Sequence, residues 1–255
     1  IYSMANEKKR LDHDLEIARD IQRILLPSEA PAINGFQISG INAPARQVSG
    51  DYFDYIQVDE ERLGVAIADV SGKGVPASLI MAICRSVLRA EAARNPSPAD
   101  VLRKVNRQLY PDIKEDMFIS MAYLILDHQR DGVTLARAGH DAPLLYKHQS
   151  EMVTPIKSPG MVVGIDSGNV FDRLTTDFAV SLERDDCLVL YTDGVTETLN
   201  AEGDEFGLER MMQSVRASAT NGAQAIVRKI IEDVRDFTGS VPQNDDITLI
   251  AIRKT

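Results

Sequence analysis

The first thirty residues carry a stripe of mainly apolar positions with a helical period. Its members are spaced alternately by four and three residues, and most charged side chains fall outside it. Pro27 stops this helix, and Pro31 and Gly35 mark a linker. We therefore divide the chain into an N-terminal linker helix, residues 1–30, and a folded domain, residues 31–255. The positions of the stripe are Leu11, Leu15, Ala18, Gln22 and Leu25, widened by Ile17, Ile21 and Ile24.

The rest of the chain changes between short apolar runs, typical of strands, and longer stretches with a helical period. Asp131-Gly132, between two such runs, is typical of a hairpin turn. The order of these elements predicts an α+β fold with two stacked, mostly antiparallel sheets and helices outside them. The expected strands are Phe36–Ile41, Tyr52–Val58, Leu63–Val70, Phe118–Leu126, Val133–Ala138, Leu144–Lys147, Met152–Pro155, Phe171–Phe178, Leu188–Thr192 and Ile247–Arg253. The expected helices are Pro76–Arg94, Ala99–Tyr110, Leu208–Ala217 and Ala223–Phe237.

Composition and charge narrow the class of protein. The chain has 255 residues, 44% hydrophobic and 26% charged, which is ordinary for a globular protein. No apolar run approaches the ~20 residues that a membrane-spanning helix needs. A net charge of −10 repels phosphate backbones and argues against nucleic-acid binding. Cys84 and Cys187 lie in apolar runs, and we expect buried reduced thiols and a cytoplasmic setting.

Four short segments that contain carboxylates stand at the ends of expected strands. Asp69 and Asp193 follow strands, whereas Asp51 and Asp245 precede them. In antiparallel pairing the end of one strand meets the start of its neighbour, so we expect the four aspartates to gather at one edge of the sheets. The segments are Gly50-Asp51-Tyr52-Phe53-Asp54, Ala68-Asp69-Val70-Ser71-Gly72-Lys73-Gly74, Thr192-Asp193-Gly194 and Asn244-Asp245-Asp246-Ile247-Thr248.

A cluster of four carboxylates favours a bound cation, because the negative charges otherwise repel one another. Ligands that are all oxygen favour Mg²⁺ or Mn²⁺. A turn or capping role explains any one of these aspartates better, but the four together favour a metal site. The histidines and cysteines show no zinc-binding spacing. The segment Ser71-Gly72-Lys73-Gly74 is not a Walker phosphate loop, since Ile67 and Gly74 stand where that motif needs Gly and Ser or Thr.

A single histidine, His140, lies in a turn after an expected strand, within Gly139-His140-Asp141-Ala142-Pro143. A lone histidine in such a turn is more often structural than catalytic. A role as a proton donor is the alternative, and the sequence leaves both open.

Five segments of the chain together resemble the SpoIIE-like, RsbU-type branch of the metal-dependent serine/threonine phosphatases (PPM, or protein phosphatase 2C-like). The resemblance covers about Leu15 to Arg253. Each segment alone is a weak signal, but five in the order of the family and at compatible spacing are highly specific. They are Val48-Ser49-Gly50-Asp51-Tyr52-Phe53-Asp54, Asp69-Val70-Ser71-Gly72-Lys73-Gly74, Ala138-Gly139-His140, Tyr191-Thr192-Asp193-Gly194 and Asp245-Asp246-Ile247-Thr248.

The resemblance implies an αββα sandwich with a centre of two Mn²⁺ or Mg²⁺ ions. Carried over by motif, Asp51 and Asp69 are metal ligands, Asp69 bridges the ions, and the carbonyl of Val70 binds one of them. Asp193 and Asp245 bind the other ion. A metal-bridging hydroxide is then expected to attack the phosphorus in line, without a phospho-enzyme.

Some positions depart from the family or stay open. In the eukaryotic branch an acidic residue precedes the first aspartate, whereas Gly50 stands here, as is usual in the SpoIIE-like branch, so one ion is expected to bind weakly. That branch also places a phosphate-binding arginine upstream, and Arg46, five residues before Asp51, is the candidate. Asp54 and Asp246 can either bind metal or orient the residues that do.

We therefore expect a bacterial, cytoplasmic protein-serine phosphatase. The resemblance alone implies its partner, a small phosphoprotein such as a phosphorylated anti-sigma-factor antagonist. Two rivals are an inactive regulatory binding module of the same fold and a metal-dependent phosphodiesterase. The presence of all four aspartates argues against the first, and the acidic surface argues against the second. Because the chain does not begin with Met, we also expect an upstream sensor or receiver domain.

The N-terminal stripe has two interpretations that its residues do not separate. It either packs on its own domain or pairs with a second chain. The resemblance favours pairing, and we expect a homodimer through a helix surface that includes Ile21 and Leu25. Such a helix would bias the helix pair Pro76–Arg94 and Ala99–Tyr110, which follows the Asp69 loop, between weakly and strongly metal-binding positions.

Overall fold

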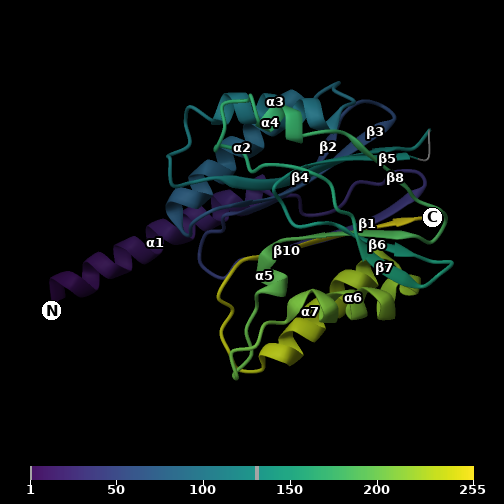
Figure 1. The fold of residues 1–255 in the computed structure, drawn as a ribbon. Coiled ribbons are helices and arrows are strands. Elements are labelled where there is room, and N and C mark those ends of the chain that lie inside the picture. Colours follow the sequence, from purple (N-terminus) through teal and green to yellow (C-terminus); the bar gives the residue numbers. More distant parts are fainter. Residues whose placement is uncertain (1, 130–131) are drawn as a thin grey trace.

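Two antiparallel sheets of five strands face each other in the computed structural model, which describes residues 2–129 and 132–255 (Figure 1). In spatial order the first sheet contains β1 (Phe36–Ala43), β10 (Ile247–Lys254), β9 (Cys187–Tyr191), β6 (Leu144–Lys147) and β7 (Met152–Pro155). The second contains β2 (Asp51–Gln57), β3 (Arg62–Val70), β4 (Ile119–Asp127), β5 (Gly132–Ala138) and β8 (Phe178–Ser181). The hairpin turn expected at Asp131 lies outside the described residues.

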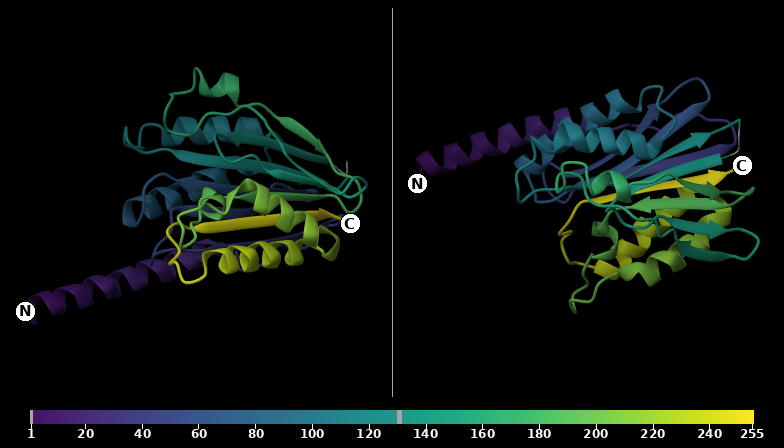
Figure 2. Two further views of the ribbon diagram at one scale, coloured as in Figure 1. Left: turned by 60° about the horizontal axis from the view of Figure 1, so that its bottom comes forward. Right: turned by 45° about the horizontal axis from the view of Figure 1, so that its top comes forward.

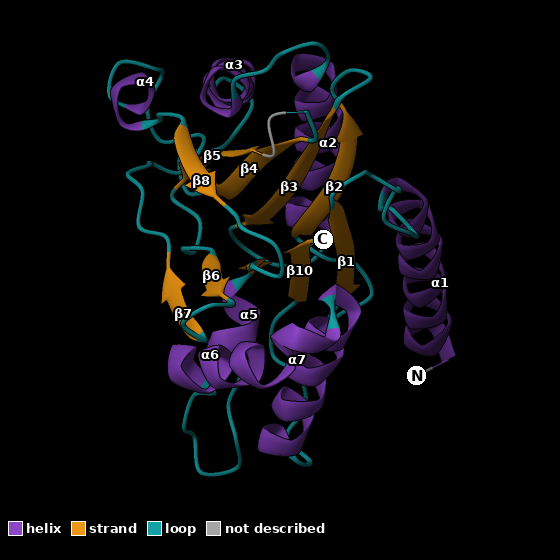
Figure 3. Ribbon diagram, turned by 90° about the vertical axis from the view of Figure 1, so that its right-hand side faces the viewer, coloured by secondary structure: helices purple, strands orange, loops and turns teal. Residues whose placement is uncertain are grey.

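Helices cover the outer face of each sheet, which confirms the expected α+β fold and the αββα order of layers (Figure 3). The helices on the β2–β8 side are α2 (Val75–Ala92), α3 (Pro98–Leu109) and the short α4 (Phe171–Leu174). Those on the β1–β7 side are α6 (Gly207–Ser218) and α7 (Ala223–Thr238), joined by the 3₁₀ turn η1 (Ala219–Asn221), while α5 (Asp193–Thr196) directly follows β9.

The apolar core forms three clusters, one between each pair of neighbouring layers. Alternation along the strands explains them, because successive side chains of a strand point to opposite faces. Leu63, Val65 and Ile67 of β3 fill the space between the sheets, whereas Ala66 and Ala68 of the same strand face α2 and α3. Asp69 continues the first of these rows, so the pattern that builds the core also directs its side chain toward the space between the sheets.

Local sequence signals set the helix ends. Pro76 lies in the first turn of α2, where its missing N–H is not needed. Ser97 caps α3, and its hydroxyl accepts a hydrogen bond from the backbone N–H of Asp100 at 3.0 Å. Gly239 ends α7 with a positive φ of 57°.

The expected strand Phe171–Phe178 is wrong. Its first half is α4, and only its last residue belongs to β8. The cause is Asp166, whose Oδ1 accepts hydrogen bonds from the backbone N–H groups of Val170 and Phe171 at 2.8 and 3.0 Å. A carboxylate that binds successive N–H groups favours a helical turn over a strand.

The first helix, α1 (Tyr2–Leu25), runs along one edge of the sandwich and extends beyond it (Figure 2). Its last turn is attached, because Arg85 Nε of α2 donates to the Leu25 carbonyl at 2.6 Å and Leu26 packs against two apolar clusters. Ile21 and Ile24 remain 57% and 82% exposed. In the described ranges, no helix has the length and apolarity needed to cross a membrane.

Candidate active site

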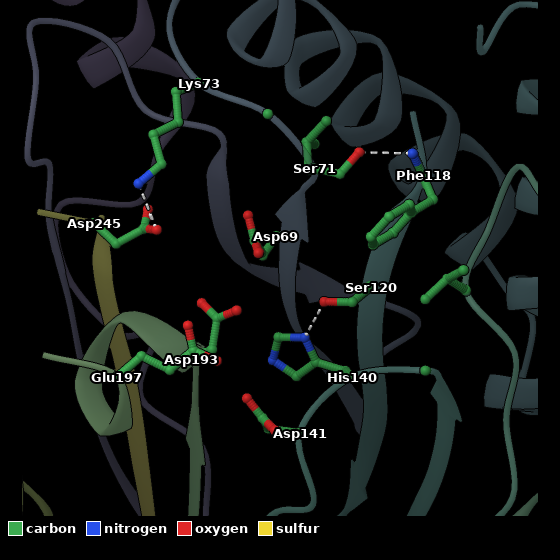
Figure 4. Close-up of a pocket in the computed structure, with 14 residues that line it drawn as sticks. Asp69, Ser71, Lys73, Phe118, Ser120, His140, Asp141, Asp193, Glu197 and Asp245 are labelled. Atoms are coloured by element: carbon green, nitrogen blue, oxygen red, sulfur yellow. Dashed lines mark hydrogen bonds and ion pairs between the residues drawn. The ribbon is translucent and has the colours of Figure 1, made fainter. Parts of the chain in front are cut away.

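Three of the aspartates singled out in the sequence line one pocket of about 360 Å³ (Figure 4). Asp69 lies near the end of β3, Asp193 begins α5, and Asp245 lies in the segment that leads into β10. Val70, whose carbonyl is the proposed metal ligand, also lines the pocket. The site therefore forms where strands of both sheets end or begin.

Asp51 lies behind this pocket rather than in its wall. It is the first residue of β2 and pairs directly with Asp69 across the β2–β3 ladder. Its Oδ2 accepts hydrogen bonds from the hydroxyls of Thr192 and Thr248 at 2.8 and 2.5 Å. Burial, and then the charge of Asp69, raise the pKa of Asp51 well above its ordinary value. Thr248 of β10 and Thr192, the residue after β9, thus hold the carboxylate of Asp51 in place.

The carboxyl groups of the pocket compete for protons. Burial, followed by the charges of Asp193 and Asp245, raises the pKa of Asp69 to about 7. Burial and the charge of Asp245 also raise the pKa of Asp193. Asp141 and Glu197 line the same pocket, and their pKa values are raised by burial and by the charge of Asp193. The pocket therefore holds more negative charge than its surroundings neutralise.

Lys73 places a positive charge in direct contact with this cluster. Its Nζ donates to Asp245 Oδ2 at 2.7 Å and to the Asn244 carbonyl at 2.8 Å (Figure 4). Among the pocket-lining residues of the described chain, it alone is a lysine or arginine. One ammonium thus faces the five acidic side chains that line the pocket.

His140 belongs to the wall of the pocket, and its surroundings favour the structural interpretation. Its Nδ1 is 2.8 Å from the hydroxyl of Ser120, and Arg137 Nη1 donates to its carbonyl at 2.5 Å. Burial lowers the pKa of the imidazole to about 4. The ring is therefore neutral near pH 7, which makes it a weak proton donor for a leaving group.

Asp246 holds the loop that leads into β2. Its carboxylate accepts hydrogen bonds from Ala45 N, Ser49 Oγ and Gly50 N at 2.8, 2.7 and 2.9 Å. The Ser49 hydroxyl in turn accepts a hydrogen bond from Asp51 N at 3.0 Å. Asp246 therefore orients the segment that carries Asp51, and it does not line the pocket.

Asp54 and Arg46 are not brought to the pocket. Asp54 is fully buried beneath α2, where Arg89 donates to both of its oxygens at 2.6 Å and the Tyr52 hydroxyl donates at 2.6 Å. Arg46 is exposed in the loop between β1 and β2 and is not among the residues that line the pocket. Both residues are close to Asp51 in the sequence. Asp54 lies three positions after Asp51 in β2, and a strand directs side chains at odd offsets to opposite faces, whereas Arg46 lies in the loop before the strand.

Two glycines allow the acidic segments to approach one another. A Cβ at Gly50 would lie 2.9 Å from the Val70 carbonyl oxygen, and one at Gly194 would collide with the backbone of Asp246. A side chain at Gly50 would therefore push against the end of β3 beside Asp69. This contact gives a physical reason for a glycine where the eukaryotic branch has an acidic residue.

The donor chemistry of the pocket fits a hard divalent cation. All of the candidate side-chain donors are carboxylate oxygens. Burial and then neighbouring carboxylates raise the pKa values of Asp69 and Asp193, and the ammonium of Lys73 already binds Asp245. In the positions they hold here, no group of three or more His, Cys, Asp or Glu side chains of the described residues is arranged to hold an ion. An ion would therefore have to draw these oxygens together.

Sequence reasoning missed some of the pocket. Glu197 gave a signal, since it follows Asp193 by four residues and so shares its face of a helical turn. Lys73 lies in one of the family segments and in the rejected phosphate loop, but the sequence assigned it no role. Ser120 and Asp141 gave no distinctive pattern, because strand pairing and the turn after β5 bring them to the pocket.

Comparison with known proteins shows the family. Residues 59–255 match the family model described as Stage II sporulation protein E (SpoIIE), which is most of the chain. The chain belongs to the SpoIIE family. Over 97% of its length it is 31% identical to the phosphoserine phosphatase RsbU of Bacillus subtilis, of which it covers 72%. It is 28% identical to the phosphoserine phosphatase RsbP of the same organism over 74% of its length, and it covers 47% of that protein.

A solved structure gives the same fold for this SpoIIE-family chain. The SiaA-PP2C domain of Pseudomonas aeruginosa superposes with a TM-score of 0.84 at 22% identity, covering 98% of this chain and 100% of that one. The family match, the RsbU relative and this PP2C-type fold agree on the RsbU-type branch of the PPM phosphatases. The chain is a protein serine/threonine phosphatase.

Proposed function

We propose that this SpoIIE-family chain is a metal-dependent phosphatase that hydrolyses phosphoserine on a small bacterial regulatory protein of the anti-sigma-factor antagonist class. The observation that carries the proposal is the convergence of Asp69, Asp193 and Asp245 on one pocket, with Asp51 directly behind it. The phosphoserine phosphatase RsbU, a relative along nearly the whole chain, supports phosphoserine as the substrate group.

Two Mn²⁺ or Mg²⁺ ions would be held by Asp51, Asp69, the Val70 carbonyl, Asp193 and Asp245. Bound there, they would supply an activated water as the nucleophile and neutralise charge on the phosphoryl oxygens. The chain's own contribution is to hold these oxygens at one edge of two sheets. Arg46 remains a candidate for phosphate binding, but the loop between β1 and β2 would have to move toward the pocket to bring it there.

The setting that we propose is the cytoplasm of a bacterium. Cys84 and Cys187 are both free and buried, and burial raises the pKa of the Cys84 thiol to about 12, so it stays an unreactive thiol. Reduced buried thiols are typical of cytoplasmic proteins.

We further propose that residues 1–30 form a regulatory linker and residues 31–255 the phosphatase domain. Ile17, Ile21 and Ile24 are exposed at the 4-3 spacing of helix pairs, which supports a homodimer through α1. Arg85 links the end of α1 to α2, the helix that follows the Asp69 loop. An upstream sensor or receiver domain would act through this helix.

The deciding experiment measures phosphate release from a phosphoserine-containing protein and from nucleotide monoesters and diesters, with Mn²⁺ and after removal of metal by dialysis against a chelator. We expect Mn²⁺-dependent release from the phosphoprotein alone. Undiminished turnover in excess chelator would exclude the metal, and preferential release from a nucleotide diester would favour a phosphodiesterase. Absence of release from every substrate, with Mn²⁺ bound, would favour the inactive binding module.

A further inference from the structure

Lys73 occupies an unusual position for a lysine in this pocket. Its ammonium contacts Asp245, one of the proposed metal ligands, and no ion pair of Asp69 or Asp193 is found in the described residues. The contact joins two loops that are 172 positions apart in the sequence, and both side chains are about 40% exposed. The pair is therefore a specific link across the pocket mouth that solvent can reach.

The loop that carries Lys73 is anchored at both ends but free between them. At its start, Ser71 N donates to the Phe118 carbonyl at 2.9 Å, and Phe118 N donates to Ser71 Oγ at 2.8 Å. At its end, α2 begins at Val75. Gly72 and Gly74 flank Lys73 with φ of 90° and 77°, and a Cβ at either would meet nothing within 4 Å. Lys73 is itself exposed, so the open space around the two glycines leaves room for its loop to move.

The charges of the pocket explain why a cation sits there. Five acidic side chains line the pocket, and their negative charges repel one another. An ammonium at Asp245 relieves part of this repulsion. Asp245 Oδ1 already accepts a hydrogen bond from Asp246 N at 2.9 Å, so a divalent cation at Asp245 would compete with the ammonium for Oδ2. The ammonium, 2.7 Å from that oxygen, would also repel the cation. The lysine and the ion therefore cannot keep the same contact.

We propose that Lys73 is a built-in counter-ion that takes the place of a divalent cation at Asp245 and must leave when the ion binds, so that it lowers the metal affinity of the site. The inference rests on the proposed metal centre. It assigns to Lys73 a role in metal loading that is separate from any contact with substrate.

The test titrates MnCl₂ alone into the metal-free full chain by calorimetry, for the parent and for Lys73→Gln. Removing the ammonium removes a competitor and a repulsive charge, so we expect Mn²⁺ to bind about two- to fivefold more tightly, the range that a half-exposed ion pair supports. Lys229→Gln is the matched control. Lys229 also pairs with an aspartate at 2.7 Å and is equally exposed, but it lies on α7, away from the pocket. The Mn²⁺ affinity of the Lys229→Gln variant should equal that of the parent.

Thermal unfolding provides a readout that a merely structural lysine would not give. Without metal, Lys73→Gln leaves the acidic cluster without its counter-ion, so its Tm should fall below that of the parent. With saturating Mn²⁺ the two Tm values should agree, because the ion then neutralises the cluster in both. If Lys73 had only a structural role, the Tm of the variant would fall below that of the parent by the same amount with and without Mn²⁺. Lys73→Arg keeps the charge and should retain the Mn²⁺ affinity of the parent.

The outcomes separate this inference from the proposed function. If the parent binds no Mn²⁺, the metal centre itself is refuted. If the parent binds Mn²⁺ and Lys73→Gln binds it equally or more weakly, the metal centre stands, and the counter-ion role is refuted in favour of a lysine that is neutral toward Asp245 or orients it. An Arg variant that behaves like the Gln variant would also overturn the role, because charge would then not be the cause.

Discussion

Asp69 connects the aspartates of the site. It pairs with Asp51 across the β2–β3 ladder, and after burial the charges of Asp193 and Asp245 raise its pKa. We expect Asp69→Asn and Asp193→Asn each to lower turnover more than about a hundredfold, because each removes a proposed metal ligand. Neither should unfold the metal-free protein. Removing one of several crowded charges should leave its free energy of unfolding unchanged or raise it by up to about 1 kcal/mol.

Steady-state kinetics at saturating Mn²⁺ and chemical denaturation of the metal-free protein measure these two effects. Asp236→Asn, on the exposed side of α7, makes the same chemical change outside the pocket and should alter neither. Near-normal turnover of either active-site variant would contradict the ligand assignment.

His140 allows a second prediction at the scale of one residue. Its pKa is lowered by burial from 6.5 to about 4, so between these values the unfolded chain binds a proton that the folded protein does not. The stability that depends on a neutral His140 is complete above pH 6.5 and is lost as the pH falls toward 4. Between pH 7.5 and pH 5 this loss amounts to about 1–2 kcal/mol.

The measurement compares unfolding free energies of the metal-free parent and His140→Gln at pH 7.5 and pH 5. The acidic residues of the pocket have the opposite pH dependence, but they are common to both proteins, so the difference between the two isolates His140. The variant should lose less stability on acidification. An imidazole that titrates near pH 6.5 by NMR would show that the ring is not held neutral.

At the scale of elements, α1 shows how one sequence stripe divides in the fold. Gln22 is buried, and Leu15, Ala18 and Leu25 are partly buried, whereas Ile21 is exposed. The Gln22 amide binds the backbone of Ser49 twice, at 2.7 and 2.9 Å, just before Asp51. The sequence offered packing on the domain and pairing with a second chain as alternatives, yet separate positions of the helix are available for each.

The exposed positions of α1 give the third prediction. Because Leu25 is partly buried, Ile24 is the better partner for Ile21 in a double substitution to Asp. We expect the parent to be a dimer by light scattering and Ile21→Asp with Ile24→Asp to be a monomer. We also expect the Mn²⁺ concentration for half-maximal activity to change about 5- to 150-fold, as is typical of coupling between sites.

A matched control for this variant is Lys8→Asp, which changes the net charge by the same two units on another side of the helix. It should leave both the mass and the titration unchanged. If the double variant keeps the mass and the Mn²⁺ titration of the parent, α1 is neither a dimer contact nor a regulatory element.

The success of sequence prediction differed between kinds of element. The strands of the core and the helices that cover them were expected within a few residues, because burial on one or both faces leaves a clear periodicity. The segment Phe171–Phe178 failed because its conformation depends on a side-chain cap from Asp166. Local apolar spacing contains no information on such a contact.

For the whole molecule, the sequence placed the fold and the main carboxylates but not the details of the site. Antiparallel order alone implied that Asp69, Asp193 and Asp245 would meet. It could not show that Asp54 accepts hydrogen bonds from Arg89, or that Lys73 donates to Asp245 across the pocket. These contacts depend on which face of a strand or loop points toward a segment that is distant in the sequence. The layers follow from local patterns, whereas the chemistry follows from long-range packing.

The position of β10 between β1 and β9 has a consequence for how the protein is made. β1 begins at Phe36, but its ladder partner begins at Ile247, so this edge strand lacks its partner until residues 247–254 have left the ribosome. The loop before Asp51 also needs this late segment, because Ser49 and Gly50 donate hydrogen bonds to the Asp246 carboxylate. Pairing across more than 200 positions closes a long loop late and slowly. A nascent chain that has emerged only as far as β9 therefore has neither the ladder partner of β1 nor the Asp246 contacts of the loop before Asp51. We expect turnover only once residues 245–254 have emerged and paired.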